Sequence, residues 1–229
     1  MKKQKLVILT GAGISAESGL KTFRDSDGLW EGYNVYEVAT PRGFAANPKL
    51  VLDFYNMRRK DVAAAKPNAA HIGLAELENF FDVTIITQNI DDLHERGGSS
   101  NVIHLHGQIF EMRSVKNDEE IFYTQGDIHL GDLAPDGGQL RPNIVWFEEP
   151  VPMIETAAEI AANADVFVVV GTSLQVYPAA GLLNCVPHST LKYILDKKIP
   201  YTSNFENLTT IEMPAALGIE TLKEYLLKL

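Results

Sequence analysis

Three short polar clusters in this chain contain side chains whose chemistry suits the binding of hydroxyl and amide groups, such as those of a ribose or a carboxamide, and the transfer of a proton. Amides and a carboxylate hold hydroxyl and amide groups, and histidine takes up a proton near neutral pH. A lone histidine is more often a structural residue. His106, however, is expected to lie close in space to the cofactor-binding loop predicted in the next paragraph, which favours a role in chemistry. The clusters are Thr87-Gln88-Asn89-Ile90-Asp91, His104-Leu105-His106-Gly107 and Gly171-Thr172-Ser173-Leu174.

A glycine-rich run follows the first apolar segment and matches the G-x-G-x-x-G/A pattern of dinucleotide-binding loops. The run is Gly11-Ala12-Gly13-Ile14-Ser15-Ala16. We expect Gly11 to form a tight turn, Gly13 to let the backbone approach a diphosphate, and Ala16 to open a closely packed helix. An ordinary strand-to-helix turn is the alternative. The acidic ribose ligand usual roughly 20 residues further on is not evident, because Glu31 and Glu37 lie in an irregular segment. A function other than simple hydride transfer is therefore considered.

Short apolar, β-branched runs alternate with amphipathic helical patterns along most of the chain. We predict strands at residues 5–10, 83–87, 101–105, 144–147, 165–170, 192–195 and 209–212, and helices at residues 49–65, 69–80, 153–162 and 217–227. Such alternation is typical of a parallel sheet covered on both faces. The predicted fold class is α/β, with a Rossmann-like doubly wound parallel sheet. Ligands bind beyond the carboxyl ends of such strands, where the three clusters are expected to gather.

Two segments do not follow this alternation, at residues 23–46 and 111–140. Long irregular stretches inside a compact domain are usually functional or form a small subdomain. We predict a single domain over residues 1–229. Its Rossmann-like core comprises about 1–22, 47–110 and 141–229, a loop region covers about 23–46, and a small subdomain is inserted at about 111–140.

The composition is that of an ordinary globular protein, with 45% hydrophobic and 22% charged residues. No apolar run approaches the roughly 20 residues that cross a bilayer, and the apolar run near the start is too short for a signal peptide. The net charge of −10 argues against non-specific nucleic-acid binding and is compatible with a lysine-rich partner. We expect a cytoplasmic protein that binds neither nucleic acid nor membrane. The oligomeric state is left open.

Several motifs, in order and at suitable spacing, resemble the signatures of sirtuins. They are Gly11-Ala12-Gly13-Ile14-Ser15, Phe23-Arg24, Thr87-Gln88-Asn89-Ile90-Asp91, His106-Gly107 and Gly171-Thr172-Ser173. The resemblance extends from about residue 6 to the C-terminus. It implies NAD as cofactor and acyl-lysine proteins or peptides as partners. The implied reaction transfers the acyl group of a modified lysine to ADP-ribose and releases nicotinamide.

The resemblance implies His106 as the base that deprotonates a ribose hydroxyl, with Asn89 and Asp91 as further catalytic residues. General-base catalysis is typically worth about 10²–10⁴-fold in rate. His104 is a poorer candidate. Alternation along a strand places its side chain on the same face as that of His106, but two residues earlier in the strand. The implied cofactor site comprises Gly11, Ala12, Gly13, Ser15, Phe23, Arg24, Gln88, Asn89, Asp91, Gly171, Thr172, Ser173 and, as a possible acceptor for ribose hydroxyls, Asp196.

In sirtuins the substrate peptide adds as a strand between two segments of the enzyme. The matching segments here are residues 145–149 and 174–178. Glu148 stands where the family usually has glycine, a change that narrows the entrance, favours basic peptides or is a neutral surface difference. The implied substrate-binding residues are Val145, Phe147, Glu148, Val176 and Tyr177.

Tyr55 and Arg58 are three positions apart on the predicted helix at residues 49–65, so they share one face. A hydroxyl beside a guanidinium can bind a carboxylate. The pair resembles the one in sirtuins that remove succinyl or malonyl groups. An amphipathic helix with an exposed arginine, continued by Arg59 and Lys60, is the alternative. We predict a desuccinylase and demalonylase that also accepts acetyl groups.

Most sirtuins hold their small subdomain with two pairs of cysteines, whereas Cys185 is the only cysteine of this chain. Within residues 111–140, His129 and the scattered acids lack the spacing of a structural zinc site. We therefore predict a compact subdomain that lacks zinc, with a mobile loop as the alternative. The residues expected to support its packing are Ile121, Phe122, Tyr123 and Ile128.

Other functions are conceivable for the same pocket. An ADP-ribosyltransferase or NAD glycohydrolase would not need Tyr55, Arg58 or a peptide cleft. An NAD-sensing module would not need the base His106 beside Asn89 and Asp91. A dehydrogenase is disfavoured because no hydride-transfer partner is evident. The deacylase is therefore the leading hypothesis.

Overall fold

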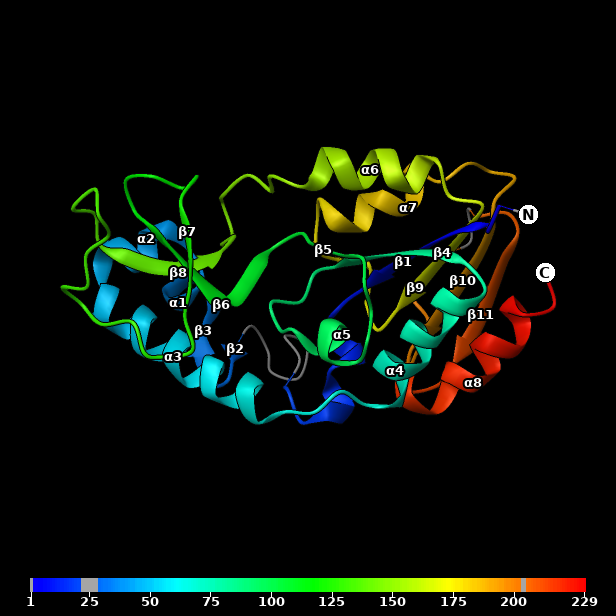
Figure 1. Cartoon of the computed structure of the whole chain (residues 1–229), viewed down its shortest axis with the longest axis horizontal. Coiled ribbons are helices and arrows are strands. Elements are labelled where there is room, and N and C mark those ends of the chain that lie inside the picture. Colours follow the sequence, from blue (N-terminus) through cyan, green and yellow to red (C-terminus); the bar gives the residue numbers. More distant parts are fainter. Residues whose placement is uncertain (1, 22–28, 203–204) are drawn as a thin grey trace.

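The computed structural model describes residues 2–21, 29–202 and 205–229. The molecule is elongated and consists of two parts (Figure 1). A six-stranded sheet with helices on both faces forms the larger part, which also holds both ends of the chain. A three-stranded antiparallel sheet and helix α3 (Pro48–Ala64) belong to the smaller part. The parallel strands run toward the smaller part, so their carboxyl ends lie near the centre of the molecule.

All strands of the larger sheet are parallel, in the order β11-β10-β9-β1-β4-β5. They are β1 (Lys5–Thr10), β4 (Asp82–Thr87), β5 (Val102–His104), β9 (Val166–Val170), β10 (Leu191–Asp196) and β11 (Leu208–Glu212). The chain proceeds outward from β1 to β5, returns to β9 on the other side of β1, and proceeds outward again to β11. This reversal defines a doubly wound sheet and opens a crevice beyond the carboxyl ends of β1 and β9. The predicted fold class is confirmed.

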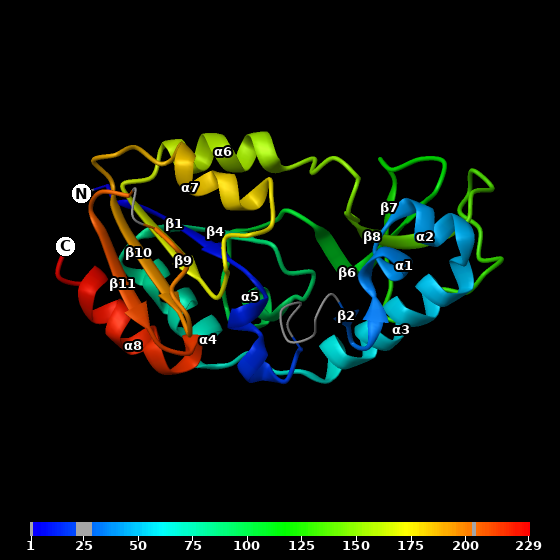
Figure 2. The ribbon, with the colours of Figure 1, turned by 180° about the vertical axis from the view of Figure 1, so that it is seen from behind.

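Helices cover both faces of this sheet because its central strands are apolar on both faces. In β1, Leu6 and Ile8 point into one buried cluster, and Val7 and Leu9 point into the other. The covering helices are α4 (Ala69–Glu76) and α8 (Ala215–Leu226) on the first face, and α6 (Ile154–Ala162) and α7 (Leu182–Cys185) on the second (Figures 1 and 2). The two-residue alternation along each strand thus supplies both layers of the core.

One predicted strand is wrong, the one at residues 144–147. The observed strand, β8 (Leu140–Ile144), ends where the predicted one begins, and it belongs to the small antiparallel sheet. Ile144 and Trp146 are both buried in a cluster with α3, and this burial accounts for the apolar character of the run. A short run of apolar residues identifies burial but not strand geometry.

The small sheet consists of β6 (Gly107–Ser114), paired with β7 (Ile121–Tyr123) and β8. Ile128 is buried, as expected, but Ile121 and Tyr123 are 50% and 67% exposed, so the expectation that they support the packing is wrong. Alternation along β7 explains the difference, because these two side chains share one face of the strand and only Phe122 points to the other.

Helix α3 and the small sheet share a third buried cluster. Phe54 and Tyr55 of α3 pack there with Ile109 of β6 and Ile144 of β8. The sequence-based division grouped residues 47–65 with the Rossmann-like core, whereas the side chains of α3 contact the small sheet. The helix therefore reaches the central crevice from the side of the smaller part.

Buried arginines connect the backbone of the smaller part. The Arg59 Nε donates to the carbonyl of Ile109 at 2.9 Å. Arg141 pairs with Glu149 at 2.7 Å, and its guanidinium lies 3.3 Å from the centre of the Trp146 ring. Charge-assisted bonds of this kind are shorter and stronger than neutral ones. The Arg141–Glu149 pair also holds Trp146, which lines the cavity described below and whose backbone N–H donates to Glu149 Oε2 at 2.8 Å.

Short elements complete the chain. The remaining strands and α-helices are β2 (Leu29–Trp30), β3 (Tyr33–Asn34), α1 (Val35–Val38), α2 (Pro41–Ala46) and α5 (Leu93–Arg96). The 3-10 turns are η1 (Ala12–Ile14), η2 (Ala16–Ser18), η3 (Leu77–Asn79) and η4 (Ala179–Gly181). Among the helices in the described ranges, none has the length and apolar character needed to cross a membrane.

Candidate functional site

A cavity of about 560 Å³ lies between the two parts of the molecule, beyond the carboxyl ends of β1, β4, β9 and β10. It brings together nearly all the residues that the sequence singled out, from segments far apart in the chain. Phe23 and Arg24 lie outside the described residues. The others line the cavity: Gly11, Ala12, Gly13, Ser15, Tyr55, Arg58, Gln88, Asn89, Asp91, His106, Val145, Phe147, Glu148, Gly171, Thr172, Ser173, Val176, Tyr177 and Asp196.

The glycine-rich loop packs closely against the loop that follows β9. The Gly13 N–H donates to the carbonyl of Gly171 at 2.8 Å. A Cβ on Gly13 would lie 2.6 Å from that oxygen, and one on Gly11 would lie 2.7 Å from Thr172 Cβ. Both glycines are therefore required for contact between the two loops. The prediction of a helix after the loop is wrong, since two short 3-10 turns, η1 and η2, follow it. They offer little of the aligned peptide dipole of a long helix.

A hydrogen-bond network orders the polar side chains before any ligand enters. The Asn89 amide donates to Ser15 Oγ at 3.2 Å, and that hydroxyl donates to Asp91 Oδ2 at 3.0 Å. The Gln88 amide donates to Thr172 Oγ1 at 3.3 Å. Loops from three strands are thereby fixed relative to one another. Pre-positioned donors and acceptors avoid the entropic cost of ordering them when a ligand binds.

Asp91 is a buried carboxyl group. Burial raises its pKa above the ordinary value, and hydrogen bonds from the Leu93 N–H at 3.2 Å and from Ser15 Oγ partly offset that effect. The group therefore lies in a low-dielectric wall of the cavity, where hydrogen bonds to a ligand are stronger than in water.

His106 has the geometry of a general base. Its Nδ1 lies 2.9 Å from the carbonyl oxygen of Gln88. Because a carbonyl oxygen can only accept, Nδ1 carries the hydrogen, and the neutral ring has its lone pair on Nε2. The described residues provide no partner for Nε2. Burial lowers the pKa of His106, and the bond to Gln88 offsets this in part. The ring is therefore neutral near pH 7 and able to accept a proton.

His104 differs from His106 in both respects. Its Nδ1 lies 3.1 Å from the carbonyl oxygen of Asn89 and its Nε2 lies 2.8 Å from Glu95 Oε1, so both nitrogens face acceptors. Burial lowers the pKa of His104, but the hydrogen bond and charge of Glu95 outweigh it, and the net change is upward. This histidine does not line the cavity. It is suited to hold the Asn89 segment rather than to act as a base.

Helix α3 presents Tyr55 and Arg58 to the cavity. The helix begins at Pro48, where the Asn47 side chain caps its first turn. Tyr55 is 0% exposed and Arg58 is 5% exposed, so the alternative of an exposed arginine is wrong. Within the described part of the chain, the Tyr55 hydroxyl and the Arg58 Nε have no hydrogen-bond partner. The Arg58 Nη1 pairs with Glu31 at 2.8 Å.

Residues 145–149 form one rim of the cavity. The Val145 N–H donates to the carbonyl of His106 at 2.9 Å, and the Phe147 N–H donates to the carbonyl of Ala39 at 3.0 Å. The rim is thus held both to the backbone of His106 and to the end of α1. These two backbone donors are engaged within the chain, so an added strand would pair with other backbone groups of the rim.

Glu148 and Tyr177 lie on opposite segments at the outer part of the cavity. Glu148 has φ of +74°, a conformation that favours glycine. Its carboxylate forms a bidentate ion pair with Arg42 of α2, with Arg42 Nε 3.1 Å from Oε2. Tyr177, next to Val176, is 72% exposed. An acidic group and an exposed aromatic ring therefore border this part of the cavity.

Asp196 and Ser173 lie at the carboxyl ends of β10 and β9. Asp196 is 3% exposed and accepts a hydrogen bond from the N–H of Lys198 at 3.0 Å. The carboxylate thus orders the turn that follows β10 and borders the same cavity as the glycine-rich loop.

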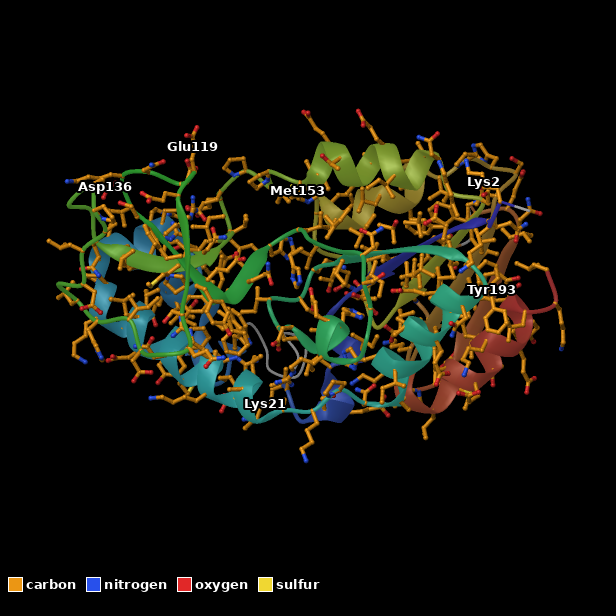
Figure 3. The ribbon with its side chains drawn as sticks, in the orientation of Figure 1. Lys2, Lys21, Glu119, Asp136, Met153 and Tyr193 are labelled. Carbon is orange, nitrogen blue, oxygen red and sulfur yellow. The ribbon has the colours of Figure 1, made fainter. Side chains whose placement is uncertain are left out.

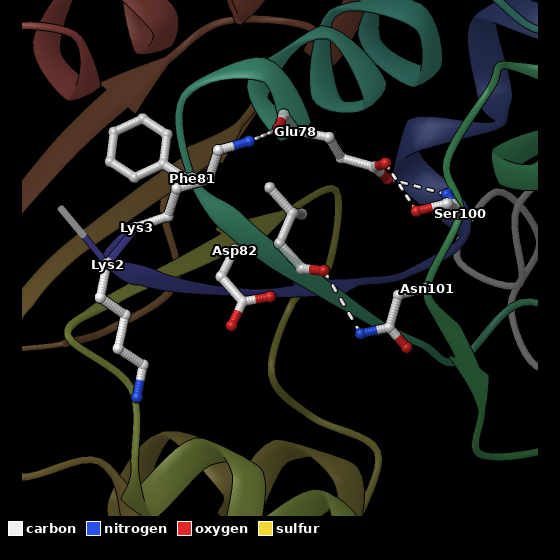
Figure 4. Close-up of a pocket in the computed structure, with 8 residues that line it drawn as sticks. Lys2, Lys3, Glu78, Phe81, Asp82, Ser100 and Asn101 are labelled. Carbon is white, nitrogen blue, oxygen red and sulfur yellow. Dashed lines mark hydrogen bonds between the residues drawn. The ribbon is translucent and has the colours of Figure 1, made fainter.

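A second pocket lies at the opposite, amino-terminal edge of the sheet (Figure 4). Lys3 Nζ donates to the carbonyl of Glu78 at 2.6 Å, and Ser100 Oγ donates to Glu78 Oε2 at 2.7 Å. The Asn101 amide donates to the carbonyl of Val83 at 3.3 Å. These groups satisfy one another and lie away from the three polar clusters. The central cavity is therefore the candidate active site.

Sequence reasoning missed several residues around Arg58 and Tyr55. The Trp146 ring lies 6.3 Å from that of Tyr55, and the Arg58 guanidinium lies 5.6 Å from the centre of the Trp30 ring. Glu31 was weighed as a ribose ligand, whereas it pairs with Arg58. These residues lie far apart in the chain and share no sequence period. Their contacts are therefore visible only in the folded structure.

Comparison with known proteins agrees with this geometry. Residues 11–178 match the family model described as the Sir2 family. A Helicobacter pylori protein named NAD-dependent protein deacylase is 49% identical over 226 residues, which cover 99% of each chain. A solved Sir2 homolog–NAD complex has a TM-score of 0.87 and 37% identity, and the match covers 99% of this chain and 90% of that one. A Sir2 complex with a p53 peptide and NAD⁺ has a TM-score of 0.81 and 31% identity over 97% and 93% of the two chains. On the match to the family model and to a relative along almost its whole length, the chain belongs to the Sir2 family.

Proposed function

We propose that this Sir2-family enzyme, an NAD-dependent protein deacylase, removes succinyl and malonyl groups from lysine side chains as well as acetyl groups. One observation carries the proposal. A single cavity contains both a histidine suited to be a base, His106, and a tyrosine–arginine pair, Tyr55 and Arg58, with donors that find no partner among the described residues. The names of the relatives support the general reaction, and the pair supports the acyl selectivity.

The polar wall of the cavity suits NAD. Amide, hydroxyl and carboxylate groups stand at the strand ends, and the glycines at positions 11 and 13 let the two loops pack closely together. Bound NAD supplies the ribose carbon that takes the acyl oxygen as nicotinamide leaves. We assign Gln88, Asn89 and Asp91 to the ribose and carboxamide, and Ser15, Thr172 and Ser173 to the phosphates and ribose. Phe23 and Arg24 are proposed to complete the site. Alignment and exclusion of water are the main contributions of the protein.

The chemical role proposed for His106 follows from its tautomer. The carbonyl of Gln88 holds the Nδ1 hydrogen, so Nε2 faces the substrate as an acceptor. Removing the proton of a ribose hydroxyl makes that oxygen a stronger nucleophile toward the acyl carbon. Asn89 and Asp91 position the hydroxyl through the network that includes Ser15.

The acyl selectivity rests on unpartnered donors. Leaving a buried donor without a partner costs about 1–3 kcal/mol. Helix α3 carries two donors for which residues 2–21, 29–202 and 205–229 supply no partner: Tyr55 Oη and Arg58 Nε. A carboxylate at the end of a succinyl or malonyl group would accept from both. An acetyl group is shorter and uncharged, so it fits without using them.

We also propose that acyl-lysine peptides lie between residues 145–149 and 174–178, as an added strand. The similar Sir2 structure that contains a p53 peptide supports a peptide substrate. Glu148 is already paired with Arg42, so its carboxylate would favour basic residues in the peptide where these compete with Arg42 for it. The net charge of −10 acts in the same direction.

The small sheet is proposed to be stable without zinc. Most members of the family hold this subdomain with two pairs of cysteines. The one cysteine of this chain, Cys185, lies on α7. Across the described residues, no group of three or more His, Cys, Asp or Glu side chains could hold a metal ion. Buried ion pairs such as Arg141–Glu149 provide cross-links instead. We expect less than about 0.1 zinc per chain, a value far below the full occupancy of a structural site, by elemental analysis after dialysis. Unfolding by a chelator would contradict the proposal.

The pH dependence of the rate should reflect the lowered pKa of His106. A base must be unprotonated, and burial lowers the pKa of His106 below the ordinary value of about 6.5. The rate is therefore expected to stay constant as the pH falls to that value and to decline only at lower pH. The measurement is kcat/KM for an acetyl-lysine peptide between about pH 5 and pH 9, a range that brackets histidine titration. A decline of kcat/KM at acidic pH with a midpoint above the ordinary pKa of histidine would contradict the assignment of His106 as the base.

One assay tests the proposed function. The purified chain is incubated with NAD and with one peptide in acetyl-, succinyl- and malonyl-lysine form, and the products are identified by mass spectrometry. We expect deacylated peptide, nicotinamide and acylated ADP-ribose in equal amounts. Nicotinamide formed without deacylated peptide would indicate an NAD glycohydrolase, and ADP-ribosylated peptide would indicate a transferase. Either result would overturn the proposal.

A further inference from the structure

The guanidinium of Arg58 already faces carboxylates that belong to the chain. Its Nη1 lies 2.8 Å from Glu31 Oε1 and 3.5 Å from Asp61 Oδ2. Lys21 Nζ lies 3.0 Å from Glu31 Oε2. The side chains of Arg58 and Glu31 are 6% and 13% exposed, so water screens this pair poorly. Among the residues that the structure describes, two cations and two anions thus balance one another beside the proposed acyl pocket.

Glu31 occupies a turn that does not favour it. The residue lies between β2 and β3, and both Glu31 and Gly32 have positive φ, +53° and +83°. Hairpin turns with positive φ at both central positions favour asparagine, aspartate or glycine, because longer side chains are strained there. The ion pair with Arg58 offers a physical reason for glutamate at this position.

The carboxylate acts on the cavity through Arg58. Arg58, Trp30 and Lys21 line the cavity, whereas Glu31 is not among its lining residues in the described part of the chain. Figure 3 marks Lys21 between the larger sheet and helix α3. Glu31 therefore leaves room for an acyl group but reduces the positive potential that the group meets.

We propose that Glu31 is a specificity-determining residue, whose charge offsets that of Arg58 and so lowers the preference of the acyl pocket for acidic over neutral groups. The inference rests on the proposed use of Arg58 for acyl carboxylates. An incoming carboxylate would be attracted by Arg58, which lines the cavity, and repelled more weakly by Glu31, which pairs with Arg58 but does not line the cavity. An acetyl group carries no charge on which either residue could act. The pocket is thereby kept open to both kinds of acyl group.

Replacing Glu31 with glutamine tests the charge while keeping an oxygen that can accept from Arg58. With saturating NAD, kcat/KM for the succinyl and malonyl peptides should rise roughly three- to tenfold, through a lower KM. The value for the acetyl peptide should stay within about twofold. Glu31→Asn, a residue that the turn favours, should shift selectivity in the same direction. The matched control is Glu37→Gln, an exposed glutamate of α1, with no change expected.

An unchanged or reduced rate on the acidic peptides in both Glu31 variants would overturn the inference and make Glu31 a residue that orients Arg58. Arg58→Met distinguishes this from failure of the proposed function. If that variant loses succinyl and acetyl activity equally, the carboxylate site itself is wrong. If it loses succinyl activity selectively while the Glu31 variants do not gain it, only the role of Glu31 is wrong.

Discussion

Replacing His106 with alanine is expected to reduce deacylation by about 10²–10⁴-fold, the usual contribution of a general base. The substitution removes Nε2, the ring atom for which the described residues provide no partner, and leaves the Gln88 carbonyl without its donor. The polar network of Asn89, Ser15 and Asp91 is formed without His106, so affinity for NAD should change little. The measurements are kcat/KM for a succinyl-lysine peptide and the Kd of NAD by calorimetry.

Two further variants separate base chemistry from positioning. His106→Asn keeps an N–H that can reach the Gln88 carbonyl but has no basic nitrogen, so it should be as inactive as His106→Ala. His188→Ala removes an exposed imidazole outside the cavity and should retain full activity. Substantial turnover by the asparagine variant would assign His106 a positioning role only.

Replacing Arg58 with methionine is expected to abolish the advantage of acidic acyl groups. A hydrogen bond to a charged group contributes about 1.5–3 kcal/mol, which corresponds to roughly 10–150-fold in kcat/KM for the succinyl peptide. The acetyl peptide makes no such bond and should lose at most a few-fold. Methionine preserves much of the buried aliphatic stem, so the packing beside Trp30 is largely kept.

The selectivity ratio, measured on three acyl forms of one peptide, distinguishes this effect from loss of folded protein. Destabilisation lowers all three rates together, whereas loss of a carboxylate partner lowers only the succinyl and malonyl rates. Tyr55→Phe should give a smaller change of the same kind. Lys60→Met, which removes an exposed cation of α3 paired with Asp127, is the matched control. Equal losses on acetyl and succinyl peptides would refute the carboxylate site.

Much of the fold could be predicted from local patterns. The strands at β1, β4, β9 and β10 are apolar on both faces, and this burial is visible as unbroken runs such as Val166–Val170. The general preference for right-handed crossovers and for helices on both faces then limits the possible strand orders, and the structure shows which one is adopted. The run at residues 144–147 could not be assigned in this way, because Ile144 and Trp146 are buried beneath a helix from a distant part of the chain.

The candidate site, like the fold, could be predicted from the sequence only in part. Residue types, order and spacing predicted which segments carry the base, the amides and the carboxylate, since strand ends meet at one edge of a parallel sheet. The same reasoning placed Tyr55 and Arg58 on one face of a helix. Their burial, and their unpartnered donors, depend on how α3 packs against the small sheet.

The sequence by itself determined the family, the parallel sheet and the set of polar residues at its carboxyl edge, because these depend on periodicity and on motifs within short segments. Only the tertiary structure decided how those residues are disposed to act. The bond between His106 and Gln88 selects the basic nitrogen, and the contact of Gly13 with Gly171 explains its glycine. The pairing of Glu31 with Arg58 places an anion beside the proposed acyl pocket. Each is a contact between segments distant in the chain, and hydrogen-bond direction and charge compensation exist only once such segments meet.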